Sequence, residues 1–281
     1  MGFKRNKRVG VVGLLQSGKT VLLTSLIAHL RNHDAIALPL DGAEIVGHCE
    51  LKPRTKLARF PFQRIRNELG QRVWPEKTLV ASEYRSRNVR IDLKQKRTTF
   101  DLSLFDFPGE RLVDLIIDEC KHYDDWCERI LHELKANPRF ENAMAPYFTA
   151  LKKAVQDSEH PSADHLILEY KRGLARLGLA RAPIVTPSTF MITHDGHHVR
   201  ETLRDVPQEK WIETLAAERP CGVSLGKQFT PLDADNRTAW PGILKPFRNH
   251  YAEYRRQVVL PFAKPLRACD ELLVLADIPM L

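Results

Sequence analysis

Four fixed residues near the amino terminus have the types and the spacing of a phosphate-binding loop. Gly13, Gly18, Lys19 and Thr20 match the pattern GxxxxGK[ST] at every fixed position. The glycines allow the backbone to turn sharply and to approach a phosphate closely, so that successive N–H groups can surround an anion. We expect Lys19 to bridge the β- and γ-phosphates and the Thr20 hydroxyl to bind Mg²⁺. The pattern therefore predicts binding of a nucleoside triphosphate.

A second set of candidate residues lies in the segment Asp106–Gly109, which has the form DxPG and follows an apolar run. A carboxylate at that position can hold Mg²⁺ through water, and Gly109 can present its N–H to the γ-phosphate and so respond to hydrolysis. Thr78 lies in a loop where a switch threonine could reach the metal, although an exposed loop threonine is an equal alternative. The predicted metal ligands are Thr20, Asp106 and Thr78. The predicted nucleotide-binding residues are Gly13, Leu14, Leu15, Gln16, Ser17, Gly18, Lys19, Thr20, Val21 and Gly109.

The residues after Gly109 are candidates for the hydrolysis step. Glu110 stands where Ras-like enzymes have a glutamine that orients the attacking water. Its negative charge would lie near an anionic γ-phosphate, so we predict slow intrinsic hydrolysis. Arg111 is predicted, with Lys19, to stabilise the charge of the transition state, and Arg85 is a second candidate arginine. The alternative is that both arginines are ordinary surface residues.

The phosphate loop can act only if a strand precedes it and a helix follows it. Residues 8–14 form a valine-rich apolar run that is typical of a buried strand, and residues 19–31 have helical apolar spacing with Leu22, Leu26 and Leu30 on one face. Further strands are predicted at 89–93, 100–105 and 272–277, and further helices at 59–73, 110–135, 140–156, 163–178, 208–217 and 246–269.

These elements predict an α/β fold, specifically a three-layer P-loop NTPase domain with a parallel sheet built from residues 9–13, 100–105 and 272–277. We assign residues 1–110 and 266–281 to the nucleotide-binding core and residues 111–265 to a large, mainly helical insertion. Because Leu281 directly follows the last strand, we expect a sheet that is incomplete at the carboxyl-terminal end and a chain that is part of a longer protein.

Composition excludes several other classes of protein. The apolar fraction of 43% and the charged fraction of 28% are ordinary for a folded globular protein. The five cysteines form no CxxC pair, and the histidines at 194, 197 and 198 do not supply three or four converging ligands, so no zinc site is predicted. Four basic residues of the amino-terminal tail supply half of the net charge of +8, and no nucleic-acid-binding motif accompanies them, so no nucleic acid partner is expected. No signal peptide precedes the first strand, and we expect a cytoplasmic protein.

Taken together, the motifs resemble those of translation-factor-like GTPases, and the chain resembles the YcjX-like family of P-loop NTPases, which are stress-associated bacterial proteins. The resemblance implies a core that binds GTP or GDP with Mg²⁺ and a helical insertion after the DxPG segment. It also implies a role in stress response and a position near the inner membrane through a membrane-protein partner. The segments that carry it are Arg8–Leu30, Trp74–Thr78, Ser82–Arg85, Asp106–Leu112 and Tyr251–Ile278.

We therefore predict a Mg²⁺-dependent nucleotide switch that binds and slowly hydrolyses GTP and relays the change to a protein partner. An NKxD motif that reads guanine does not occur in the sequence and is expected beyond Leu281, so the preference for guanine rests on the resemblance. The alternatives are an ATP-dependent phosphotransferase or ATPase, and a scaffold that holds nucleotide without significant hydrolysis.

Overall fold

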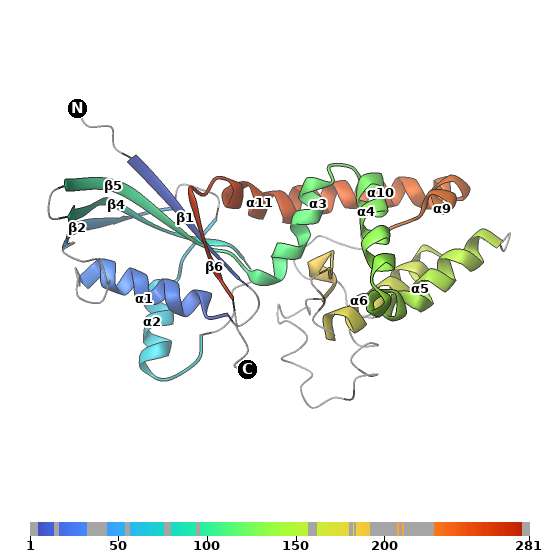
Figure 1. Ribbon diagram of the computed structural model, residues 1–281, viewed down its shortest axis with the longest axis horizontal. Coiled ribbons are helices and arrows are strands. Elements are labelled where there is room, and N and C mark those ends of the chain that lie inside the picture. Colours follow the sequence, from blue (N-terminus) through green and yellow to red (C-terminus); the bar gives the residue numbers. More distant parts are fainter. Residues whose placement is uncertain are drawn as a thin grey trace. The chain divides into compact units, whose positions relative to one another are not determined.

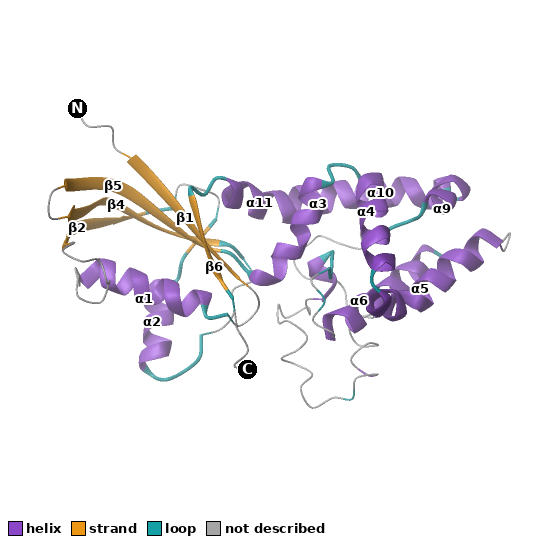
Figure 2. Cartoon of the chain, viewed as in Figure 1, coloured by secondary structure: helices purple, strands orange, loops and turns teal. Residues whose placement is uncertain are grey.

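The chain folds as two compact units in the computed structural model, residues 1–110 with 261–281 and residues 111–260. All strands of the described residues lie in the first unit, and regular structure in the second is helical (Figures 1 and 2). The structure describes residues 5–13, 17–32, 44–53, 57–75, 80–93, 96–156, 162–179, 182, 184–191, 207, 210 and 228–276.

The first unit is built on a mixed sheet with the strand order β2-β4-β5-β1-β6, and β3 also pairs with β4. The strands are β1 (Arg5–Gly13), β2 (Glu44–Leu51), β3 (Ala58–Arg59), β4 (Ser82–Leu93), β5 (Lys96–Asp106) and β6 (Glu271–Leu275). Strand β1 runs parallel to β5 and to β6, whereas β4 runs antiparallel to β2 and β5. The α/β class is confirmed, and the three strands that were predicted to be parallel are parallel, but the sheet as a whole is mixed because β2 and β4 add antiparallel pairs. The link between β4 and β5 is too short for a crossover, so these strands can only be antiparallel neighbours.

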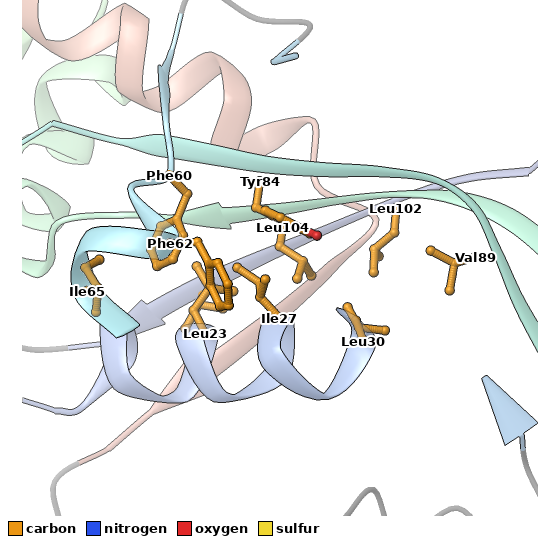
Figure 3. Close-up of a cluster of buried hydrophobic side chains, with 11 residues drawn as sticks. Leu23, Ile27, Leu30, Phe60, Phe62, Ile65, Tyr84, Val89, Leu102 and Leu104 are labelled. Atoms are coloured by element: carbon orange, nitrogen blue, oxygen red, sulfur yellow. The ribbon is translucent and has the colours of Figure 1, made fainter. Parts of the chain in front are cut away.

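Helices α1 (Lys19–Asn32) and α2 (Phe62–Gly70) pack against one face of this sheet. Between the helices and the sheet lies a cluster of buried apolar side chains, to which α1 contributes Leu23, Ile27 and Leu30. Full burial of each of these side chains stabilises the fold by about 1.5–3 kcal/mol. Of the face predicted for this helix, Leu30 is buried and Leu26 packs against the cluster, but Leu22 is 39% exposed and Leu23 takes the buried position instead. The cluster consists of Val11, Leu23, Ile27, Leu30, Phe60, Phe62, Ile65, Tyr84, Val89, Leu102 and Leu104 (Figure 3).

Aromatic rings hold the other face of the sheet near the carboxyl end of β5. Phe107 stacks on Phe105 with ring centroids 5.8 Å apart and meets the edge of Phe262 at 5.6 Å. Phe262 belongs to α11 (Leu260–Arg267). A Cβ atom on Gly10 would lie 2.9 Å from Phe107 Cε2 and 2.8 Å from Leu272 Cδ2, so only glycine at this position allows Phe107 to pack this closely against β1. This packing fixes the strand end that carries Asp106.

Two of the predicted helices, 140–156 and 163–178, are present within two residues as α5 and α6, whereas two longer predicted helices are broken in the structure. Residues 110–135 were predicted as one helix, but the chain forms a 3₁₀ turn and two helices there, with a break at Cys120–His122. Residues 246–269 likewise form parts of α10 and α11 with a π-helical turn between them. The predicted helix 208–217 lies almost wholly outside the described residues. The elements are η1 (Gly109–Asp114), α3 (Leu115–Glu119), α4 (Tyr123–Ala136), α5 (Pro138–Gln156), α6 (Ala163–Leu179), η2 (Ser188–Met191), α9 (Ala234–Ala239), α10 (Pro241–Tyr254) and η3 (Arg255–Val259).

A buried carboxylate ties the end of η1 into the helical unit. Asp114 accepts hydrogen bonds from Ser188 N at 2.8 Å, Ser188 Oγ at 2.5 Å, Thr186 Oγ1 at 3.1 Å and the Tyr254 hydroxyl at 2.8 Å. Burial raises the pKa of Asp114, and the bonds from Ser188 and Tyr254 act against that rise. Hydrogen bonds donated to a carboxylate offset the unfavourable free energy of burying it. The chain segment that begins at Gly109 therefore ends at a fixed point inside the second unit.

Candidate functional site

The phosphate loop joins the end of β1 to the start of α1, as the pattern requires. Gly18 has φ +79°, a left-handed conformation that glycine adopts without strain. A Cβ atom on Gly13 would lie 2.4 Å from the carbonyl oxygen of Leu275 in β6, so this position also requires glycine. The first N–H groups of a helix point out of its amino-terminal end and are suited to bind an anion, and in α1 these belong to Lys19, Thr20 and Val21. Leu14, Leu15 and Gln16 lie outside the described residues.

The ammonium group of Lys19 lies against this loop. Its Nζ donates to the carbonyl oxygen of Gly13 at 2.9 Å and to Ser17 Oγ at 3.3 Å. The side chain is only 9% exposed, and these two contacts are to neutral polar atoms of the loop itself. A phosphate oxygen is a stronger acceptor for an ammonium than a neutral carbonyl or hydroxyl. Lys19 can therefore exchange these contacts for a phosphate with little movement.

Thr20 and Asp106, which are 86 residues apart in the sequence, are in direct contact. Thr20 Oγ1 donates to Asp106 Oδ2 at 3.0 Å, while the second carboxylate oxygen of Asp106, Oδ1, is buried without a hydrogen-bond partner. Burial raises the pKa of Asp106, the Thr20 bond and the Lys19 charge lower it, and the negative charge of Glu110 raises it. A hydroxyl and a carboxylate are hard oxygen ligands, and an orphaned carboxylate oxygen is suited to bind a water of a hydrated Mg²⁺. These residues fit a magnesium ion.

The sheet fixes the position of this pair. The parallel register of β1 and β5 places Asp106 beside Val11, and Phe107 N donates to Val11 O at 3.2 Å. Because side chains alternate between the faces of a strand, Asp106 lies on the face covered by α1 and Phe107 on the other. The carboxyl ends of parallel strands are the usual place for a ligand in an α/β sheet.

The other predicted site residues lie in different surroundings. Gly109 is buried and Glu110 is partly exposed at the start of η1. Arg111 belongs to the helical unit, where its charge lowers the pKa of Asp114 and of Tyr254. Arg85 is 9% exposed and pairs with Ser103, and strand alternation places its side chain on the face opposite Tyr84 and Asp106.

Some of the predictions concern residues that the structure does not describe, and others concern metal-binding clusters and membrane spans. Thr78 and the histidines at 194, 197 and 198 lie outside the described ranges. Within those ranges, no group of three or more His, Cys, Asp or Glu side chains could hold a metal ion. No helix among the described residues combines the length and the apolarity that a membrane span requires.

Sequence reasoning missed Ser82, which the β4–β5 register places directly opposite Asp106. The segment Ser82–Arg85 carries part of the family resemblance, but nothing in it assigns this serine to the site, because its neighbour Asp106 is 24 residues away and is set only by strand pairing. Asp114 was missed for the same reason, since its partners lie 72 to 140 residues further along the chain.

Comparison with known proteins agrees with this arrangement. The family model described as the YcjX-like family, DUF463, matches residues 7–209. A curated relative from Shewanella oneidensis, described as "Ras-like GTPase YcjX", is 28% identical over 161 aligned residues. The match covers 48% of this chain and 33% of the relative, so the chain aligns with only about a third of that protein's length.

Proposed function

Because the chain belongs to the YcjX-like family, we propose that it is a Mg²⁺-dependent nucleotide switch that binds GTP and hydrolyses it slowly. The contact between Thr20 and Asp106, beside the loop that holds Lys19, is the observation that carries the proposal. A nucleoside triphosphate with a metal ion uses all three groups at once. The similarity to a protein described as a Ras-like GTPase favours guanine over adenine.

Each residue of the site has a proposed role in nucleotide binding. The loop from Gly13 to Val21 surrounds the phosphates, and Lys19 bridges the β- and γ-phosphates. Thr20 binds Mg²⁺ directly, Asp106 binds it through water, and Thr78 is a further ligand. Mg²⁺ neutralises the charge that develops on the phosphates during transfer. Orphaned Asp106 Oδ1 supports this assignment, because a buried carboxylate oxygen without a donor is costly.

The proposed switch runs through the 3₁₀ turn η1. Gly109 would donate its N–H to the γ-phosphate of GTP and release it after hydrolysis. The same turn ends at Asp114, which four hydrogen bonds fix in the helical unit. A shift of Gly109 must therefore be absorbed within six residues or passed to the contacts of Asp114.

The helical unit is the proposed docking surface for an unidentified protein partner. Stress response and a partner at the inner membrane are the setting that we propose from family membership. Direct evidence for a switch would be a partner protein whose measured affinity differs between the GTP-bound and the GDP-bound forms.

Calorimetry with the full-length protein tests the choice of nucleotide. We expect GTP and GDP, each with Mg²⁺, to bind at least ten-fold more tightly than ATP. Equal affinities for ATP and GTP would refute the GTPase assignment and leave a general P-loop NTPase. Tight binding of GTP with no turnover over hours would instead favour a scaffold that holds nucleotide.

Replacement of Glu110 by glutamine tests the predicted slow hydrolysis. Glutamine removes a negative charge beside the γ-phosphate and keeps an oxygen that can orient water, so single-turnover hydrolysis of GTP is expected to be about ten-fold faster. Rapid-quench measurement with excess protein gives the rate, and Glu119→Gln, an exposed position in α3, is the matched control. An unchanged rate would remove Glu110 from the mechanism.

A further inference from the structure

Ser82 and Asp106 place two unsatisfied oxygen atoms on the same face of the sheet. They are directly opposite each other in the antiparallel pair β4–β5, and such pairs have Cβ atoms about 4.5–5.5 Å apart. Ser82 is 2% exposed, and neither its Oγ nor Asp106 Oδ1 has a hydrogen-bond partner. The next pair on this face is Tyr84 with Leu104, and both side chains lie in the cluster over α1 (Figure 3). Ser82 therefore lies on the same side of the sheet as Thr20.

A buried hydroxyl without a partner is unfavourable, and a ligand that supplies a hydrogen-bond donor would remove this penalty. Water has two hydrogens and can donate one to each of two nearby acceptors. A water molecule bound to Mg²⁺ near Thr20 could donate one hydrogen to Asp106 Oδ1 and the other to Ser82 Oγ. Because the hydroxyl is neutral, it provides this acceptor without adding charge to a site that already contains Asp106 and Glu110.

Ser86 shows why the position of Ser82 matters more than its burial. Its hydroxyl is also fully buried without a partner, and it lies on the same face of the same strand. However, Ser86 pairs with Leu102 inside the apolar cluster, and no carboxylate lies opposite it. Two serines in one strand thus share their burial and differ in their cross-strand neighbour.

We propose that Ser82 is a positioning residue for Mg²⁺, whose hydroxyl binds the metal-bound water that Asp106 Oδ1 also binds. This inference rests on the proposed nucleotide function and adds a residue to the same site. Ser82 acts through the water and does not touch the nucleotide, so it should influence the affinity for Mg²⁺ and leave the metal-free contacts to the nucleotide unchanged.

Release of fluorescently labelled GDP, measured as a function of Mg²⁺ concentration, tests this inference with Ser82→Ala and the matched control Ser86→Ala. For Ser82→Ala, we expect the half-effective Mg²⁺ concentration to rise about three- to ten-fold, the effect of one lost hydrogen bond. With Ser86→Ala it should equal that of the wild type, and in EDTA all three proteins should release GDP at the same rate. Ser82→Thr, which keeps the hydroxyl, should restore Mg²⁺ affinity.

The outcomes separate this inference from the proposed function. A wild-type protein that binds no GDP would overturn both. Mg²⁺-dependent GDP release by the wild type with an unchanged half-effective concentration in Ser82→Ala would overturn only the role of Ser82. Faster release by Ser82→Ala in EDTA, or a loss of thermal stability without a change in Mg²⁺ affinity, would show a structural role and would also overturn it.

Discussion

Replacing Lys19 with alanine is expected to weaken binding of GTP by about 100-fold or more, because a hydrogen bond to a charged group contributes about 1.5–3 kcal/mol and the ammonium would make two. In the free protein, Nζ contacts the neutral atoms Gly13 O and Ser17 Oγ, which it can exchange for phosphate oxygens. The alanine variant should keep its fold, because the apolar cluster under α1 does not include Lys19. Calorimetry with GTP and Mg²⁺, together with a thermal unfolding curve, measures both quantities.

Lys7→Ala is the matched control for the loss of one positive charge. Lys7 lies in β1 of the same unit, its side chain is 44% exposed, and its Nζ is 3.6 Å from Glu271. This exposed pair contributes little to stability, so the control should bind GTP like the wild type. If Lys19→Ala retained wild-type affinity, the phosphate loop would not be the nucleotide site.

Replacing Asp106 with asparagine is expected to change metal binding and stability in opposite directions. In the variant, the half-effective Mg²⁺ concentration for GDP release should rise about ten-fold or more, which is a common effect of substitutions around a metal ion. Without nucleotide, however, it should be more stable than the wild type at pH 7, by an amount on the order of 1 kcal/mol. The reason is that Asp106 is 3% exposed and one of its oxygens has no donor, whereas the amide is neutral and can still accept the bond from Thr20.

The pH dependence of stability provides a second measure of the same residue. Burial raises the pKa of Asp106 in the folded protein above 3.8, so folding favours the protonated form. Its contribution to stability is therefore fully present below the unfolded pKa and is lost as pH rises through the folded pKa. The advantage of Asp106→Asn should accordingly be small near pH 4, increase above it and then level off. For the same reason, Mg²⁺ should bind the wild type more weakly at low pH, because it competes with a proton.

Thermal unfolding of nucleotide-free protein across this pH range checks the prediction, with Asp101→Asn as the matched control. Asp101 is a second buried carboxylate in β5, 8% exposed, and it accepts a hydrogen bond from Asn88 N at 3.1 Å. Its asparagine variant should keep the wild-type response to Mg²⁺. An Asp106→Asn protein that is less stable than the wild type at pH 7, or that still responds fully to Mg²⁺, would contradict this account.

Local sequence patterns determined the parts of the site that depend on backbone conformation. Gly18 has the left-handed φ that its place in the loop demands, and Gly13 passes too close to Leu275 for any side chain. A strand before the loop, a helix after it and the α/β class follow from apolar periodicity, which is also local. Resemblance to the YcjX-like family is confirmed by the family match. The chemical roles of the site residues remain predictions.

Local sequence patterns do not determine which face of a helix is buried, or where strands form and helices break. The apolar spacing of α1 left the buried face ambiguous by about one residue, and packing selected Leu23 rather than Leu22. Strand β2 was not predicted at all, because Gly47 and His48 interrupt its apolar residues and leave no regular alternation. The helix expected at 110–135 breaks at Cys120–His122, between α3 and α4, a break that its apolar pattern did not reveal.

The contacts that make a site were decided only by the tertiary structure. Thr20 meets Asp106 across 86 residues, Ser82 lies opposite Asp106 through strand register, and Asp114 meets Tyr254 across 140 residues. A sequence can place a carboxylate at the end of a strand, but only the packed sheet decides which of its oxygens loses contact with water and which donor remains within reach. Which polar atoms are satisfied is a property of the whole fold, and the proposed metal site depends on the ones that are not.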